Sequence, residues 1–164
     1  MRGLGKEPVR RVEGGQSAFT LVEILIVAAI VATLATLAIP FYLRSRVTAN
    51  ETMAINSCRI IVASSQAYYA SATPHTYPGT LAELAPPIAN PPYIDALLGA
   101  ATSTSSSKQG YYYLYERVSS QTYTLNAAPV TPSVTGSRYF YTDESGVIRV
   151  NPSGAAGPSD PPVE

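Results

Sequence analysis

The residue with the clearest chemical consequence is a glutamate, Glu23, that lies inside an apolar run. The 21 residues from Phe19 to Ile39 are apolar except for three threonines and this glutamate. At about 1.5 Å of rise per residue, such a run crosses a hydrocarbon core of about 30 Å. An ionised carboxylate there costs about 2.5 to 3.5 kcal/mol unless a cation compensates it. The run contains no Lys, Arg or His, so the cation has to come from outside the run.

Proteolysis between Ala18 and Phe19 would supply that cation. The cut would release residues 1–18 and create a positively charged α-amine on Phe19, about one helical turn before Glu23. Within one chain the carboxylate lies about 6 Å farther along the helix axis, which makes the pairing awkward. Between two helices that are offset along their axes the pairing is easy. Polymerisation is therefore the natural way to neutralise Glu23.

Two other fates of the apolar run stay open. The segment 1–18 is polar and rich in glycine and arginine, which favours a cytoplasmic N-terminal side. A secretory signal peptide would be cut after the run, where Thr36-Leu37-Ala38 is a poor site because Ile39-Pro40 follows. An uncleaved signal anchor would keep Met1 and simply tether the chain.

The residues around Glu23 also carry a resemblance to a known family. The string S-A-F-T-L-V-E-I-L-I-V-A-A-I-V-A, which begins at Ser17, resembles the prepilin cleavage and methylation motif of type IV pilins and type II secretion pseudopilins. The motif has an aromatic first mature residue, a glutamate at the fifth place and a long apolar run. Pro40, 21 positions after Phe19, matches the helix-kinking proline of many members. The family usually has glycine before the cut, where this chain has Ala18; a cut after Gly15 would place Glu23 eighth.

The resemblance implies how the chain is processed and where it resides. A prepilin peptidase of the inner membrane would cleave between Ala18 and Phe19 and methylate the amine of Phe19. Glu23 would pair with that amine, or with a neighbour's, as subunits leave the membrane and enter a helical homo-oligomeric filament. The chain would start as a single-pass precursor in the inner membrane, meet a pilus or secretion assembly machinery, and end in an extracellular or periplasmic filament. The resemblance leaves a type IV pilus subunit and a type II secretion pseudopilin as alternatives.

The element that positions Glu23 is expected to be one long helix. Between Thr20 and about Ala72 the chain has no glycine and one proline, which favours a helix of about 80 Å. Residues 19–39 would form its transmembrane and assembly half, and residues 40–72 its amphipathic half. Pro40 is expected to bend or locally melt the helix. The amphipathic half has an apolar stripe at helical spacing, made of Val47, Ala54, Cys58, Ile61 and Tyr68.

The rest of the chain predicts a small sheet after a long loop. Residues 73–110 are rich in Pro, Ala, Ser and Thr and form the expected loop, in which Thr80 could cap a turn that carries Leu81 and Leu84. Four strands are expected within residues 111–150, at 111–118, 122–127, 138–142 and 147–150. The short links between them, with Gly146 in one, favour an antiparallel meander. Residues 151–164 contain four prolines and predict a flexible tail. The fold class is therefore α+β, a long helix packed on about four antiparallel strands, similar in layout to a type IV pilin.

The composition argues against several classes of function. Eleven basic residues balance eleven acidic ones without a basic face, so nucleic acid is not indicated as a partner. Cys58 and His75 are single, which excludes an intrachain disulfide and a Cys/His zinc cluster. No catalytic motif is present, so we expect neither an enzyme nor a cofactor or metal, and Asp143-Glu144 is interpreted as a turn. A membrane-tethered binding module remains the alternative to a filament subunit.

Overall fold

The structure is a computed structural model that describes residues 19–163, and it has an α+β fold. The chain divides into two compact units, of which the first ends at Ile39 and the second begins at Pro40. In order, the elements are α1 (Leu21–Ser71), the 3-10 helix η1 (Leu81–Leu84), α2 (Ala96–Ala100), β1 (Tyr111–Arg117), β2 (Tyr123–Pro129), β3 (Tyr139–Asp143) and β4 (Arg149–Asn151). The expected long helix and four-stranded antiparallel sheet are both confirmed.

Helix α1 is helical at each of its 51 residues, and Pro40 interrupts none of them. Of the two outcomes expected at Pro40, a bend or local melting, the melting is therefore wrong. Pro40 removes one backbone donor, but good helix formers lie on both sides of it, Leu37 and Ala38 before and Leu43 and Arg44 after, and the helix continues past the missing bond. The first half of α1 is long and apolar enough to cross a membrane, and no residue of that apolar segment is buried.

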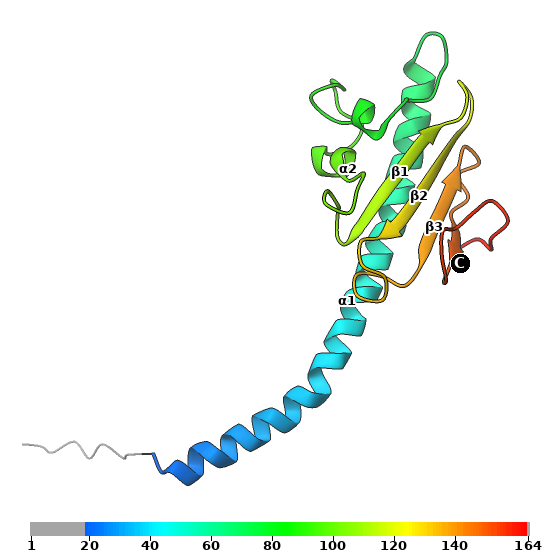
Figure 1. The fold of residues 1–164 in the computed structure, drawn as a ribbon. Coiled ribbons are helices and arrows are strands. Elements are labelled where there is room, and N and C mark those ends of the chain that lie inside the picture. The colour runs from blue at the N-terminus through cyan, green and yellow to red at the C-terminus, as the bar shows by residue number, and fades with distance from the viewer. Residues whose placement is uncertain (1–18, 164) are drawn as a thin grey trace, which may run out of the picture. The chain divides into compact units, whose positions relative to one another are not determined.

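The sheet is an antiparallel meander in the order β1-β2-β3-β4 (Figure 1). Its register pairs Tyr113 with Ala127 and Asn126 with Tyr141. Each predicted strand end lies within two residues of the observed one. Gly146 closes the β3–β4 turn at a φ of 74°, a left-handed conformation that glycine adopts without strain.

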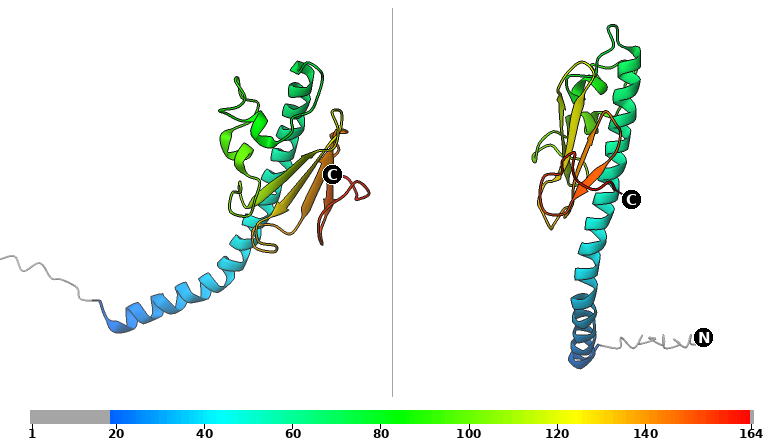
Figure 2. Two further views of the ribbon diagram at one scale, coloured as in Figure 1. Left: turned by 45° about the horizontal axis from the view of Figure 1, so that its top comes forward. Right: turned by 90° about the vertical axis from the view of Figure 1, so that its right-hand side faces the viewer.

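One face of the sheet packs on the second half of α1, and both views of Figure 2 show this arrangement. The strands alternate, so that Tyr111, Tyr113 and the β2 residues Tyr123 and Leu125 are fully buried. From α1 the predicted stripe supplies Ala54, Cys58 and Ile61, all 1% exposed or less. The tyrosine-rich strands therefore serve the core, where the apolar rings fill the layer between helix and sheet.

The segment between α1 and the sheet is more ordered than a plain loop. The expected turn is present as η1, in which Leu81 and Leu84 are buried, but the Thr80 side chain makes no capping hydrogen bond. Helix α2 was not expected from the sequence. It begins after Asp95, whose Oδ1 accepts a hydrogen bond from the Leu98 backbone N–H at 3.0 Å, which is the role of an N-cap residue.

The segment after β4, expected as a flexible tail, returns to the sheet. The Val150 N–H donates to the Pro161 carbonyl at 2.9 Å, and the Val163 N–H donates to the Ile148 carbonyl at 2.8 Å. The Asp160 carboxylate closes the turn by accepting from the Gly157 N–H at 2.8 Å. The prediction is therefore corrected up to Val163. The prolines of this segment suggested a flexible tail, but the segment forms a turn that the Asp160 carboxylate stabilises.

Candidate functional site

Glu23 and Thr20 form the first turn of α1 together. The Glu23 Oε2 atom accepts hydrogen bonds from the Thr20 backbone N–H and from the Thr20 hydroxyl, each at 2.9 Å. In return, the Glu23 N–H donates to the Thr20 hydroxyl at 3.2 Å. This reciprocal arrangement is a capping box, in which a Thr and a Glu three residues later satisfy the free N–H groups of a helix start. Glu23 therefore has a local structural role that the sequence analysis missed, although the T-x-x-E spacing signals it.

The capping box uses only part of the hydrogen-bonding capacity of Glu23. Within residues 19–163, Glu23 Oε1 accepts no hydrogen bond, and Glu23 belongs to neither of the two salt bridges. The surrounding side chains are apolar and more than half exposed, among them Leu21, Val22, Ile24, Leu25 and Val27. Glu23 therefore presents one free carboxylate oxygen and an uncompensated charge on an otherwise apolar surface.

The other predicted site residues are placed only in part. Phe19 precedes the first turn of α1, next to the capping box, and is 80% exposed. Ala18 lies outside the described residues, and the structure gives no geometry for the predicted cleavage site. Pro40 lies inside α1, seventeen residues after Glu23. Phe19 and Glu23 are thus close in the chain, whereas Pro40 belongs to the second unit.

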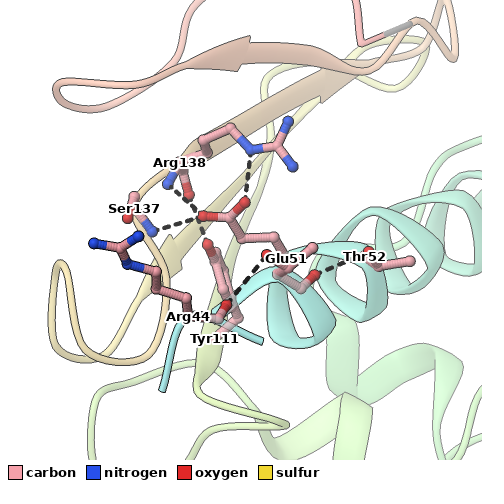
Figure 3. Close-up of polar contacts among 7 residues, drawn as sticks. Arg44, Glu51, Thr52, Tyr111, Ser137 and Arg138 are labelled. Carbon is pink, nitrogen blue, oxygen red and sulfur yellow. Dashed lines mark hydrogen bonds and ion pairs between the residues drawn. The ribbon is translucent and has the colours of Figure 1, made fainter. Parts of the chain in front are cut away.

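A second polar cluster, which the sequence did not indicate, joins α1 to the loop before β3 (Figure 3). Glu51 is 6% exposed, and its Oε2 lies 2.7 Å from Arg138 Nε. Its Oε1 accepts from the backbone N–H groups of Ser137 and Arg138 at 2.8 and 3.2 Å. Three donors therefore satisfy a carboxylate that would be costly to bury alone.

Neighbouring contacts fix the same loop. The Asn50 side-chain amide donates to the Thr135 carbonyl at 2.8 Å, and the Tyr111 hydroxyl donates to the Arg138 carbonyl at 2.8 Å. Gly136 lies directly against the Tyr111 ring, so that a Cβ at this position would overlap the tyrosine hydroxyl. The loop 130–138 is consequently held to α1 by at least four polar contacts.

The buried titratable groups are unsuited to catalysis near neutral pH. Complete burial raises the pKa of the Cys58 thiol from 9.0 to about 12, so it stays protonated. Burial, and next the charge of Glu51, raise the pKa of Tyr111 above its usual value. His75 is exposed, its ring stacks on Tyr69, and its Nδ1 lies 2.9 Å from the Tyr69 carbonyl oxygen. None of these groups is arranged as a nucleophile with an adjacent base.

The acidic turn between β3 and β4 has the expected local chemistry. Asp143 Oδ1 accepts hydrogen bonds from the backbone N–H and the hydroxyl of Ser145 at 3.0 and 2.5 Å. This is the side-chain mimicry of a turn that aspartate commonly provides. Over the part of the chain that the structure describes, no three His, Cys, Asp or Glu side chains gather as possible metal ligands.

Comparison of the chain with protein-family models, with curated proteins and with solved structures finds no match. The chemistry of Glu23 and the apolar surface around it therefore carry the functional argument.

Proposed function

We propose that this chain is a structural subunit of a type IV pilus or a pilus-like filament, processed by a prepilin peptidase and polymerising through its apolar N-terminal helix. The observation that carries the proposal is the exposed apolar half of α1, near whose start Glu23 has no ion-pair partner within residues 19–163. Apolar side chains of this number, fully accessible on a helix, need either lipid or other helices around them. A subunit that passes from the membrane into a helical bundle meets both in turn.

The capping box fits this proposal and refines its electrostatics. Cleavage before Phe19 leaves the Thr20 N–H as an amide, so the bonds from Thr20 to Glu23 Oε2 can persist in the mature chain. Glu23 Oε1 then remains free for the new α-amine of Phe19 or of a neighbouring subunit. A methylated amine stays cationic, which preserves the ion pair. In this proposal Glu23 therefore has two roles, one within the helix and one between subunits.

The second half of α1 has a different role from the first half, and this difference fits the proposal. It is packed on the sheet by a continuous core that includes Cys58, Ile61 and Tyr113. The unit that begins at Pro40 therefore has its own buried core. Such a unit can be displayed on a filament while the apolar half of α1 forms the contacts that polymerise it.

Substitution of Glu23 separates the two roles. Glu23→Gln keeps an acceptor at the third helical position, which serves in capping boxes, but removes the charge. We expect this variant to insert in the membrane and be cleaved, and to yield filaments at about a tenth or less of the wild-type level, given about 1.4 kcal/mol or more per ion pair in lipid. Thr20→Val is the matched control. It removes the hydroxyl of the capping box, keeps the charge, and should assemble.

Filaments sheared from cells and mass spectra of the mature N-terminus are the measurements. A chain that begins at methylated Phe19 is the expected product. Wild-type yields from Glu23→Gln would contradict the pairing and leave α1 as a simple tether for a binding module. Recovery from the cell surface would favour a pilus subunit, and confinement to the envelope a type II secretion pseudopilin.

A further inference from the structure

A groove of about 550 Å³ opens on the unit that begins at Pro40, between α1 and the loop 130–138. Leu43, Val47 and Val134 supply apolar walls, and Arg44 and Arg138 supply guanidinium groups. Figure 3 shows the Arg138 side chain against the Glu51 carboxylate and the Arg44 side chain on the other side of that carboxylate, near Ser137. The groove therefore combines apolar surface with positive charge.

The accessible charge of the groove is positive. Arg44 makes no hydrogen bond or salt bridge through its side chain within residues 19–163. Arg138 uses Nε for Glu51, which leaves its two terminal nitrogens for another acceptor. Glu51 also lines the groove, but it is 6% exposed and already accepts from three donors. Two arginines and one glutamate give a net charge of +1.

The loop wall of the groove is preformed. Ser133 has a φ of 66°, which is uncommon for a residue other than glycine, and its N–H donates to the Gly136 carbonyl at 2.8 Å. Contacts from Asn50 and Glu51 hold the same loop, so the surroundings enforce this conformation. Strain that is enforced in this way is frequent at ligand sites.

The place of the groove in the chain suggests its ligand. Arg44 follows Ile39, the last residue of the apolar run, by five residues, or about 7.5 Å of helix. A bilayer of about 40 to 45 Å with a hydrocarbon core of about 30 Å has about 5 to 7 Å of headgroup on each side. When residues 19–39 occupy the hydrocarbon, Arg44 is therefore near the level of the lipid phosphates.

We propose that this groove binds the headgroup phosphate of an anionic phospholipid. Arg44 and the terminal nitrogens of Arg138 donate to the phosphate oxygens, a geometry that suits the planar guanidinium. Leu43, Val47 and Val134 contact the glycerol and the first methylene groups. A zwitterionic headgroup is disfavoured, because its cation would find only the already satisfied Glu51. The proposal rests on the membrane placement in the proposed function, but not on filament assembly.

Lipid retention by the full chain tests the proposal. The protein is reconstituted in nanodiscs of equal phosphatidylglycerol and phosphatidylcholine, and native mass spectrometry counts the lipids that stay bound. Wild type should retain one phosphatidylglycerol in preference to phosphatidylcholine. Arg44→Gln should reduce that preference about five-fold, which corresponds to about 1 kcal/mol for one arginine near an anionic surface. Val134→Glu, at a side chain that is 65% exposed, should reduce it as well by repulsion.

Arg46→Gln is the matched control, because Arg46 is two residues away, lies over the Tyr42 ring and does not line the groove. Equal losses from Arg46→Gln and Arg44→Gln would overturn the proposal in favour of diffuse juxtamembrane charge. Unchanged retention in both groove variants would also overturn it. A cross-linked dimer that forms in pure phosphatidylcholine and is abolished by Arg44→Gln would overturn the proposal too. That result would show that the groove binds a carboxylate of a second copy of the chain. Extraction of the chain from vesicles by alkaline carbonate would instead contradict the membrane placement itself.

Discussion

Glu51 of α1 and Arg138 in the loop before β3 are 87 residues apart in the chain, yet Glu51 Oε2 lies 2.7 Å from Arg138 Nε. The same carboxylate accepts the N–H groups of Ser137 and Arg138. The Glu51 side chain thus takes the place of a backbone acceptor for these two N–H groups. This contact connects the helix to the sheet outside their shared apolar core.

Removal of the Glu51 carboxylate should destabilise the unit that begins at Pro40. Glu51→Ala leaves two backbone N–H groups and a part-buried guanidinium without their acceptor, which we expect to lower the free energy of unfolding by about 2 to 4 kcal/mol. Glu51→Gln keeps one acceptor oxygen and should cost about half as much. Urea unfolding of the full chain in detergent measures both. The control is Glu144→Ala at an exposed turn, and a loss as large in that variant would contradict the assignment.

Alanine at Gly136 should also be destabilising, for a steric reason. The added Cβ would overlap the hydroxyl and ring of Tyr111, which is fully buried and cannot move aside. We expect a loss of about 2 kcal/mol or more in thermal or urea unfolding. Gly154→Ala is the matched control, since nothing lies within 4 Å of its Cβ position and its φ is ordinary. That variant should be neutral or slightly stabilising, by about 0.4 to 1 kcal/mol.

The stability of the unit that begins at Pro40 should decrease at alkaline pH. Burial raises the pKa of the Cys58 thiol from 9.0 to about 12 and raises the pKa values of Tyr111, Tyr113 and Tyr123 as well. Above pH 9 the unfolded chain releases protons that the folded chain still holds, so the free energy of unfolding falls as pH rises from about 9 to 12. Urea midpoints and tyrosinate absorbance follow the loss. Cys58→Ala should shift the onset of this loss of stability to the higher pH at which the tyrosines titrate. A midpoint that is constant from pH 8 to 11 would contradict the burial of these groups.

Loss of the Asp160 carboxylate should release the last segment of the chain from β4. Asp160 accepts from the Gly157 N–H and from the Asn151 side-chain amide, and these bonds place Pro161 beside Val150. In Asp160→Ala we expect the Val150 amide hydrogen to exchange about five-fold faster, because one local hydrogen bond contributes about 1 kcal/mol. Exchange measured by NMR or mass spectrometry gives the rate. Ser159→Ala, an adjacent exposed position, should leave it unchanged.

The parts of the fold that follow local rules were predictable from the sequence. A stretch without glycine and with one proline predicted α1, and four strand candidates joined by short links predicted the meander. Both outcomes depend on side chains within a few residues of each other, such as the turn closed by Gly146. The capping box belongs to the same class. Thr20 and Glu23 have the T-x-x-E spacing of this motif, so the sequence contains the signal for the capping box. The sequence interpretation considered only an ion pair for Glu23.

The contacts that depend on tertiary structure could not be predicted in this way. Glu51 is one acidic residue among the exposed side chains of a helix until the loop 130–138 folds against it, and the sequence contains no local signal for that pairing. The groove beside Arg44 exists only because of the same packing. The end of the chain was misjudged since its prolines suggest disorder, while its order comes from one aspartate that bonds to residues on both sides of the turn.

The segment after β4 restricts how copies of this unit can pair at high density. Its Pro161 carbonyl is bonded to Val150 of β4, its Val163 N–H is bonded to Ile148 just before β4, and its prolines at 161 and 162 have no amide hydrogen at all. An incoming strand would find no regular row of donors along this border of the sheet. Copies of this unit at high density are thereby protected from pairing edge to edge along this border, and ordered contacts are left to other surfaces.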